Sequence, residues 1–323
     1  MKNSSGRPKV ALALGGGAAR GLAHIGILKV LEKHDIPIDI IVGTSMGAMI
    51  GGAYAAGLNA SQLEEIACST NWKRVVQILF PRKVQRGGLL DGMRIQEFLI
   101  SLLGERKIEE LPLRFACVAT NLWSGEEIIL DSGSLVKAIR ASISFPFLFQ
   151  PAEIDGTYLI DGGVVNPVPV SIARSLNADI VLAVKVTPSV EHHSKRLSSG
   201  TLVTKESLIV ANSSSFFLQR LFGNFSERFL EFENKKRSGK IARLSFRKQM
   251  AHVATTMENM ILTLRLRETP PDLLIAPDVN DFQFFDFLRP REIIKQGETA
   301  GEQALPLIQK LLAKNVAVNE AHR

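Results

Sequence analysis

Short apolar runs alternate with segments of helical periodicity along most of the chain, and this order limits the possible folds most. The runs predicted as strands are Lys9–Leu14, Asp39–Val42, Arg114–Thr120, Glu126–Leu130, Asp179–Val186 and Leu273–Ala276. Helices are predicted over Ala19–His34, Met46–Ala56, Arg94–Leu103, Leu135–Ala141, Pro167–Leu176 and Pro290–Leu312. Apolar strands that alternate with helices predict a mainly parallel sheet covered on both faces, a three-layer α/β/α fold.

One segment departs from this alternation and predicts an α-helical insertion or cap. It begins polar, becomes rich in phenylalanine, and ends in an apolar stripe at helical spacing that includes Met250, Met257 and Leu264. The predicted division is a flexible N-terminus over 1–8, a catalytic core over 9–186, the basic helical insertion over 187–268, a return to the core over 269–314, and a flexible tail over 315–323.

The net charge of +7 is confined to this insertion. Val186–Glu268 holds 14 Lys and Arg against 7 Asp and Glu, and the rest of the chain balances. A local basic surplus beside aromatic residues predicts peripheral contact with an anionic membrane through 216–264, although a solvated helical face gives the same pattern. No nucleic acid is expected as a partner, because the segment has no RNA-binding signature or zinc finger.

Two features bear on compartment and on membrane insertion. The first apolar run is too short for a signal-peptide core, so a cytoplasmic protein is expected, in places peripheral at the inner membrane surface. Ile40–Leu58 is uncharged and near the length of a membrane span, but its five glycines favour a strand, a turn and a small-residue helix. Cys68 and Cys117 show no disulfide framework or metal spacing, and we expect both to be reduced and buried.

A glycine-rich loop, Gly15-Gly16-Gly17-Ala18-Ala19-Arg20-Gly21, joins the first strand to the first helix. Glycines allow close backbone approach, and a helix N-terminus offers free N–H groups to a phosphate or an oxyanion. Arg20 stands where the dinucleotide fingerprint needs glycine, and the Gly-Lys-Ser/Thr of a P-loop is absent, so neither nucleotide motif fits. A purely structural turn is the ordinary alternative.

A G-x-S-x-G sequence, Gly43-Thr44-Ser45-Met46-Gly47, follows the second strand and precedes a helix. This strand–turn–helix context is the one that a nucleophile elbow requires, with Gly43 and Gly47 leaving room for the sharp turn. The sequence therefore predicts Ser45 as a nucleophile.

A serine nucleophile needs a base, and the six histidines are poor candidates. His24, His34, His192, His193, His252 and His322 lie in helices, a polar linker or the tail, and none follows a strand. Asp161 ends a short apolar run and precedes Gly162 and Gly163, so a turn there would expose its carboxylate. Taken alone, this pattern favours an ordinary turn aspartate, which is common before glycine.

Together, in this order, the three sites resemble the patatin-like phospholipase family. The glycine loop, the elbow and the D-G-[AG] motif at Asp161–Gly163 match, as do Leu22–Leu28, Ala141–Pro146 and Asp161–Pro169, and the likeness covers about residues 9–188. It is closer to bacterial members with a helical insertion than to plant storage proteins.

The resemblance implies a Ser–Asp dyad that hydrolyses acyl esters of phospholipids or related lipids without cofactor or metal. It assigns Ser45 as nucleophile, Asp161 as base, the N–H groups of Gly15, Gly16, Gly17 and Ala18 as oxyanion donors, and Arg20 as a ligand for lipid phosphate. The alternative is a catalytically silent regulator on the same fold, acting at the membrane surface.

Overall fold

The computed structural model describes residues 7–69, 92–146, 148–188 and 246–321. Its contacts divide the chain into two units, Met1–Ser189 with Thr255–Arg323, and Val190–Ala254. Of the second unit only 246–254 are described, as the first turns of helix α10, and all that follows concerns the first unit. The predicted phenylalanine-rich part of the insertion, 216–245, lies outside the described residues.

The strands form one eight-stranded mixed sheet in the order β5-β6-β3-β2-β1-β7-β8. Strand β4 lies off this path and pairs with the edge of β3 opposite β2. Their bounds are β1 Val10–Leu14, β2 Ile40–Thr44, β3 Arg114–Asn121, β4 Glu127–Leu130, β5 Ala152–Ile154, β6 Thr157–Asp161, β7 Ile180–Val184 and β8 Leu273–Ile275. The pairs β3–β2, β2–β1, β1–β7 and β7–β8 are parallel, and β4, β5 and β6 pair antiparallel. The predicted mainly parallel sheet is confirmed.

Helices cover both faces of the sheet. The large core cluster contains α1 Ala23–Lys33, α2 Met46–Ala55, α3 Ala60–Ser69, α5 Met93–Leu103, α6 Leu135–Ser142 and α11 Pro290–Ala321. A smaller cluster on the opposite face contains α7 Val170–Ser175 and part of α10 Phe246–Glu268. Short 3-10 helices are η1 Ala18–Leu22, η2 Ile108–Glu110 and η3 Gly162–Val164. The fold is therefore the expected three-layer α/β/α arrangement.

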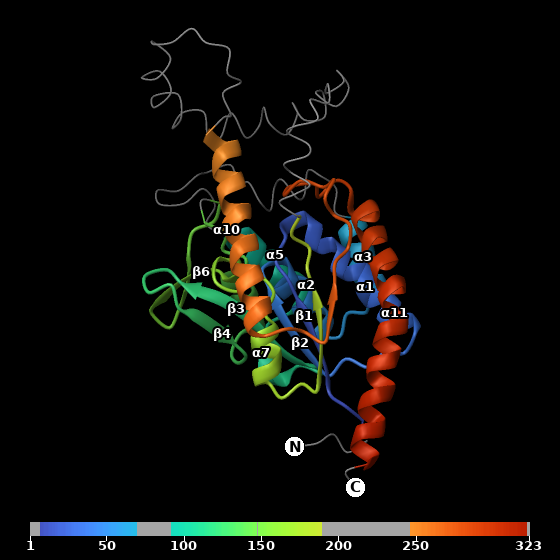
Figure 1. The fold of residues 1–323 in the computed structure, drawn as a ribbon. Coiled ribbons are helices and arrows are strands. Elements are labelled where there is room, and N and C mark those ends of the chain that lie inside the picture. The colour runs from blue at the N-terminus through green and yellow to red at the C-terminus, as the bar shows by residue number, and fades with distance from the viewer. Residues whose placement is uncertain (1–6, 70–91, 147, 189–245, 322–323) are drawn as a thin grey trace, which may run out of the picture. The chain divides into compact units, whose positions relative to one another are not determined.

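Helices α1 and α11 pack backbone against backbone (Figure 1). A Cβ added to Gly26 would lie 2.0 Å from the Ile294 carbonyl oxygen, and one added to Gly297 would lie 1.9 Å from that of Ala23. Only glycine permits this approach. The C-terminal helix is thereby fixed against the helix that follows the glycine loop.

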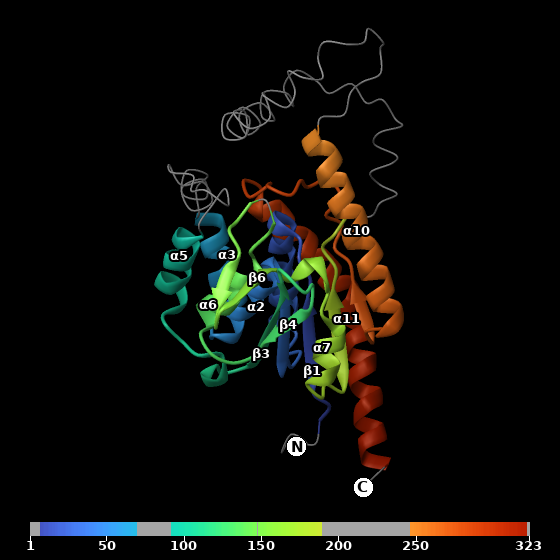
Figure 2. The ribbon, with the colours of Figure 1, turned by 90° about the vertical axis from the view of Figure 1, so that its left-hand side faces the viewer.

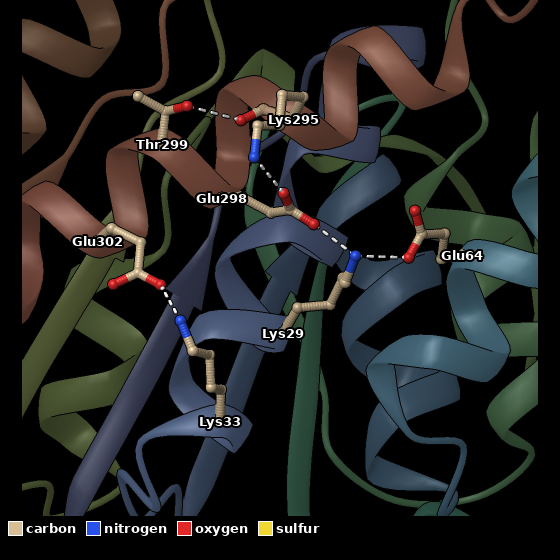
Figure 3. Close-up of polar contacts among 7 residues, drawn as sticks. All are labelled: Lys29, Lys33, Glu64, Lys295, Glu298, Thr299 and Glu302. Carbon is tan, nitrogen blue, oxygen red and sulfur yellow. Dashed lines mark hydrogen bonds and ion pairs between the residues drawn. The ribbon is translucent and has the colours of Figure 1, made fainter.

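An ion-pair network joins α1, α3 and α11 along the same interface (Figure 3). Lys29 Nζ pairs with Glu64 at 2.6 Å and with Glu298, which also pairs with Lys295 at 3.0 Å. Hydrogen bonds to Glu298 and Glu64 raise the pKa of Lys29. Lys33 pairs with Glu302 at 2.7 Å nearer the solvent.

The structure corrects several local predictions. Helix α7 begins after Pro169 rather than at Pro167, and α11 continues to Ala321 through the predicted tail. Helix α3 begins with a capping box formed by Asn59 and Gln62, whose side chains each accept the other's backbone N–H.

The structure also places the two cysteines and the uncharged stretch Ile40–Leu58. Cys117 is buried as expected, whereas Cys68 is only partly buried. Ile40–Leu58 forms β2, a turn and α2, as the sequence indicates. Among the described residues, no helix is both long and apolar enough to cross a membrane.

Candidate active site

The three sequence motifs meet where the parallel strands end. The strand order reverses at β1, with β2 and β3 on one side and β7 and β8 on the other. Such switch points form crevices at the carboxyl ends of strands. Figure 2 shows helix α7 beside β1. The glycine loop follows β1 and Ser45 follows β2.

The register of β3 brings Ser45 beside Asp161. Thr44 of β2 pairs with Val118, and Asp161 of β6 pairs with the next residue, Ala119, while β4 occupies the opposite edge of β3. Strands β2 and β6 therefore meet head to head along one edge. Ser45, which follows Thr44, and Asp161, the last residue of β6, are therefore neighbours.

Ser45 occupies a sharp turn between β2 and α2. Its φ of 54° and ψ of −119° lie in a region that non-glycine residues rarely adopt. A Cβ on Gly47 would lie 2.1 Å from the Leu14 carbonyl oxygen, so α2 starts in direct contact with the end of β1. Ser45 N–H donates to Ser142 Oγ at 2.9 Å, which holds the turn against α6.

The Asp161 carboxylate is buried and receives two hydrogen bonds. Ser45 Oγ donates to Oδ2 at 2.6 Å, and the Gly163 N–H donates to Oδ1 at 2.8 Å. Its side chain is only 3% exposed. Burial raises the pKa of Asp161 to about 6, against the lowering effect of those two hydrogen bonds. The carboxylate is thus more basic than an ordinary aspartate and aimed at the serine hydroxyl.

The backbone around Asp161 is held from both sides. Its N–H donates to the Ser144 carbonyl at 3.0 Å, and its carbonyl accepts from Thr120 Oγ1 at 2.9 Å. A Cβ on Gly162 would lie 2.3 Å from the Val118 carbonyl oxygen, so no side chain fits there. These contacts fix the carboxylate before any substrate binds.

The glycine loop lies directly against Ser45. A Cβ added to Gly16 would lie 3.3 Å from the Ser45 Cβ. The N–H groups of Gly15 and Gly16 donate to the carbonyls of Val184 and Pro167, each at 3.0 Å. These two N–H groups are therefore already used to hold the loop. Of the four predicted oxyanion donors, Gly17 and Ala18 are left.

Gly17 and Ala18, the other two predicted oxyanion donors, lie at the start of η1. Within the described part of the chain, neither N–H group has a protein acceptor. Ala18 adopts a φ of 49°, a left-handed conformation that is uncommon for alanine. Free N–H groups at the start of a helix attract negative charge.

His24 lies behind the glycine loop and is not the partner of Ser45. Its Nε2 donates to the Gly15 carbonyl at 2.8 Å, and its side chain is fully buried. Burial lowers the pKa of His24 to about 4, so the ring is neutral at physiological pH. His34 lies near Glu302 at the far end of α1. The side chains of His192, His193, His252 and His322 lie outside the described residues.

Arg20 is largely buried and partly committed. Its Nε donates to the Phe282 carbonyl at 3.1 Å. Burial lowers its pKa, although the charges of Glu258 and Asp286 act to raise it. The role of Arg20 as a ligand for lipid phosphate stays a prediction.

Several residues at this edge of the sheet escaped the sequence reasoning. Ser142 and Ser144 lie within a block already noted as familiar, but no spacing linked them to Ser45 or Asp161. Burial raises the pKa of Glu258 on α10 and the charge of Asp161 raises it further, and the local sequence of that helix carries no signal of this influence. Within the described residues, no group of three or more His, Cys, Asp or Glu side chains is arranged to hold a metal ion.

Comparison with known proteins settles the family. The model of the patatin-like phospholipases matches residues 12–174, from β1 through most of α7. The chain belongs to this family. An uncharacterized NTE family protein of Mycobacterium tuberculosis is 38% identical over 185 residues, which cover 57% of this chain and 51% of that protein.

Two further similarities are weaker. The lysophospholipase NTE1 of Debaryomyces hansenii is 29% identical over 303 residues, covering 92% of this chain and 18% of that protein. The crystal structure of VipD from Legionella pneumophila superposes with a TM-score of 0.46 at 14% identity, covering 95% of this chain and 69% of that one. The patatin-like chain described here thus spans about half, or much less, of the curated relatives that it matches.

Proposed function

We propose that this patatin-like protein is a serine hydrolase of lipid acyl esters, with phospholipase A, lysophospholipase or carboxylesterase activity. The observation that carries the proposal is the 2.6 Å hydrogen bond from Ser45 Oγ to the buried Asp161 carboxylate, made at a strained strand-to-helix turn. A nucleophile within hydrogen-bond reach of a base that is itself held in place is the arrangement that covalent catalysis needs.

In the first step Ser45 Oγ attacks the ester carbonyl carbon while Asp161 Oδ2 accepts its proton. The N–H groups of Gly17 and Ala18 stabilise the oxyanion that forms. Such donors each typically contribute about 3–4 kcal/mol to transition-state stabilisation. The proton then passes from Asp161 to the leaving alcohol, and an acyl group remains on Ser45.

In the second step water hydrolyses the acyl-enzyme. Asp161, again ionised, accepts a proton from the attacking water, and the tetrahedral intermediate collapses to release the fatty acid and restore the Ser45 hydroxyl. The raised pKa of Asp161 supports both proton transfers, because a base with a pKa close to the working pH is the more effective catalyst. No cofactor enters either step.

The test is turnover of a short-chain p-nitrophenyl ester and of a lysophospholipid by wild type, Ser45→Ala and Asp161→Asn. We expect a loss of about a thousandfold or more in both variants with the fold retained. Wild-type turnover in either variant would refute the dyad. If wild type is inactive and a fluorophosphonate does not label it, the catalytically silent regulator is favoured instead.

We also propose that the protein contacts anionic membrane from the cytoplasmic side through α10. Met257, Met260 and Leu264 recur at helical spacing and are 57%, 62% and 62% exposed, which is unusual for large apolar side chains. The basic surplus of the surrounding segment complements anionic lipid. Flotation with anionic liposomes should fall when Met257, Met260 and Leu264 are changed to Ser, and unchanged flotation would contradict this contact.

A further inference from the structure

His24 is a buried polar side chain behind the glycine loop, and the proposed reaction gives it no part. It is the second residue of α1 and is fully buried. Its Nε2 lies 2.8 Å from the Gly15 carbonyl oxygen. A carbonyl oxygen can only accept a hydrogen bond, so the neutral ring carries its proton on Nε2 and none on Nδ1.

The other ring nitrogen of His24 has no partner. Its Nδ1 is buried, and no described residue makes a hydrogen bond to it. A buried polar atom without a partner is destabilising, and an apolar side chain of similar size would avoid that cost. What the imidazole provides at this position, and an apolar side chain would not, is the Nε2–H donor.

The peptide group between Gly15 and Gly16 is held at both ends. Its carbonyl oxygen accepts from His24, and its N–H donates to the Pro167 carbonyl at 3.0 Å. A peptide group is planar, so bonds at its two opposite ends fix its orientation. A Cβ added to Gly47 would lie 2.9 Å from the same carbonyl oxygen of Gly15. The start of α2 therefore contacts the atom that His24 holds.

The next two peptide groups carry the free N–H donors of the loop. These N–H groups belong to Gly17 and Ala18, and neither has an acceptor in the part of the chain that the structure describes. A Cβ added to Gly16 would lie 3.3 Å from the Ser45 Cβ, so this stretch passes directly beside the nucleophile. Glycine dihedral angles are permissive, so the direction of the two N–H groups depends on the held peptide group before them.

We propose that His24 is a positioning residue of the oxyanion hole, which acts through the Gly15 carbonyl. Its Nε2–H holds the glycine loop so that the free N–H groups of Gly17 and Ala18 point at the oxyanion formed beside Ser45. The inference rests on the proposed function for the reaction that forms this oxyanion. Because His24 transfers no proton and lies behind the loop, its loss should weaken binding of the transition state and leave binding of the substrate unchanged.

His24→Gln and His24→Met form a matched pair, because the two side chains have equal length and only glutamine can donate a hydrogen bond. On a lysophospholipid below its critical micelle concentration, we expect His24→Met to lower kcat about a hundredfold, the scale of a misplaced oxyanion donor, with KM within about twofold of wild type. His24→Gln should recover about tenfold or more of that loss. Ile27→Val, which trims a fully buried side chain of the same helix, is the control for lost packing and should keep both constants near wild type.

Two inhibitors separate positioning from general damage to the site. An alkyl trifluoromethyl ketone accepts Ser45 Oγ at its carbonyl carbon, the serine proton passes to Asp161, and the carbonyl oxygen becomes the oxyanion. The corresponding secondary alcohol keeps the alkyl chain but forms no bond to the serine. We expect His24→Met to weaken binding of the ketone by about the factor that it takes from kcat, and binding of the alcohol by less than about twofold. Equal losses for the two inhibitors, or equal kcat values for the two variants, would refute the positioning role.

The imidazole ring gives a readout that needs no turnover. Nitrogen NMR of wild type should show a protonated Nε2 and an unprotonated Nδ1 at about pH 7. The opposite tautomer would overturn the inference, even if His24→Met does not fold.

Failure of the proposed function would be seen separately. It fails if wild type hydrolyses no ester and binds the ketone no more tightly than the alcohol. The positioning role of His24 then stands if the amide signals of Gly17 and Ala18 shift in His24→Met and keep their places in His24→Gln. It fails if the two variants behave alike.

Discussion

The two faces of the sheet are covered in different ways. On the α1 face, α11 packs against α1 through glycines at backbone distance and through the ion pairs of Lys29. On the α7 face, α10 is held by the buried side chain of Leu262 and by hydrogen bonds from Asn259 and Arg265. The densely packed face supports His24 and the glycine loop. The α1 face is therefore held by backbone contact and charge, and the α7 face by single side chains.

Gly297→Ala should have the largest effect on stability, because it breaks the packed face. The new Cβ would meet the Ala23 carbonyl oxygen at 1.9 Å, where neither helix backbone can yield without moving. We expect a loss of about 3 kcal/mol or more in the free energy of unfolding, measured by urea titration. Gln303→Ala, on an exposed position of the same helix, should change it by less than about 0.5 kcal/mol. Equal effects would show that the close packing contributes nothing.

Leu262→Ala should break the other face at a smaller cost. Removing this buried side chain leaves a cavity under α10, and we expect a loss of about 2–3 kcal/mol. Met260→Ala on the exposed side of the same helix should be nearly neutral in the same titration. A larger loss for Met260→Ala than for Leu262→Ala would mean that the described packing of α10 is wrong.

Asp161→Asn should raise stability while it removes activity. A folded pKa of about 6 against an ordinary 3.8 means that Asp161 stabilises the fold below about pH 4, and that this contribution is lost as the pH rises through about 6. The neutral amide avoids burying a charge, so at about pH 8 we expect a gain of up to ~3 kcal/mol, reduced by weaker hydrogen bonds to Ser45 and Gly163. At about pH 4 the gain should disappear. A variant that is less stable than wild type at both pH values would contradict the burial of the charge.

Lys29→Met should have the smallest effect of these changes. It removes the centre of the ion-pair network, but the side chains of Lys29, Glu64 and Glu298 are all between 20% and 35% exposed. We expect a loss of about 1 kcal/mol that shrinks at high salt. Lys33→Met, at a more exposed pair, should cost less. A loss as large as that of Gly297→Ala would show that ion pairs, rather than backbone contact, hold α11 against α1.

The sequence predicts the features that local patterns mark, and it does not predict those that depend on packing between distant segments. The strands, the elbow at Ser45 and the turn after Asp161 are marked by local patterns of apolar residues and glycines, and the structure brings Ser45 and Asp161 together as those patterns suggest. Which loop N–H groups remain free could not be predicted, because Val184 and Pro167 accept from Gly15 and Gly16 only after β7 and the segment before α7 are in place. Glu258 lies 97 residues after Asp161 in sequence, and nothing around it signals that burial and the charge of Asp161 raise its pKa.

The rate at which a fluorophosphonate labels Ser45, measured across pH, tests the central claim most directly. If Asp161 is the base, labelling of wild type should rise about tenfold per pH unit below about pH 6 and level off above it, because only the ionised carboxylate accepts the proton. Asp161→Asn should be labelled about a thousand times more slowly and without that rise. Labelling that is independent of pH between about 5 and 7, or that survives Asp161→Asn, would contradict the dyad.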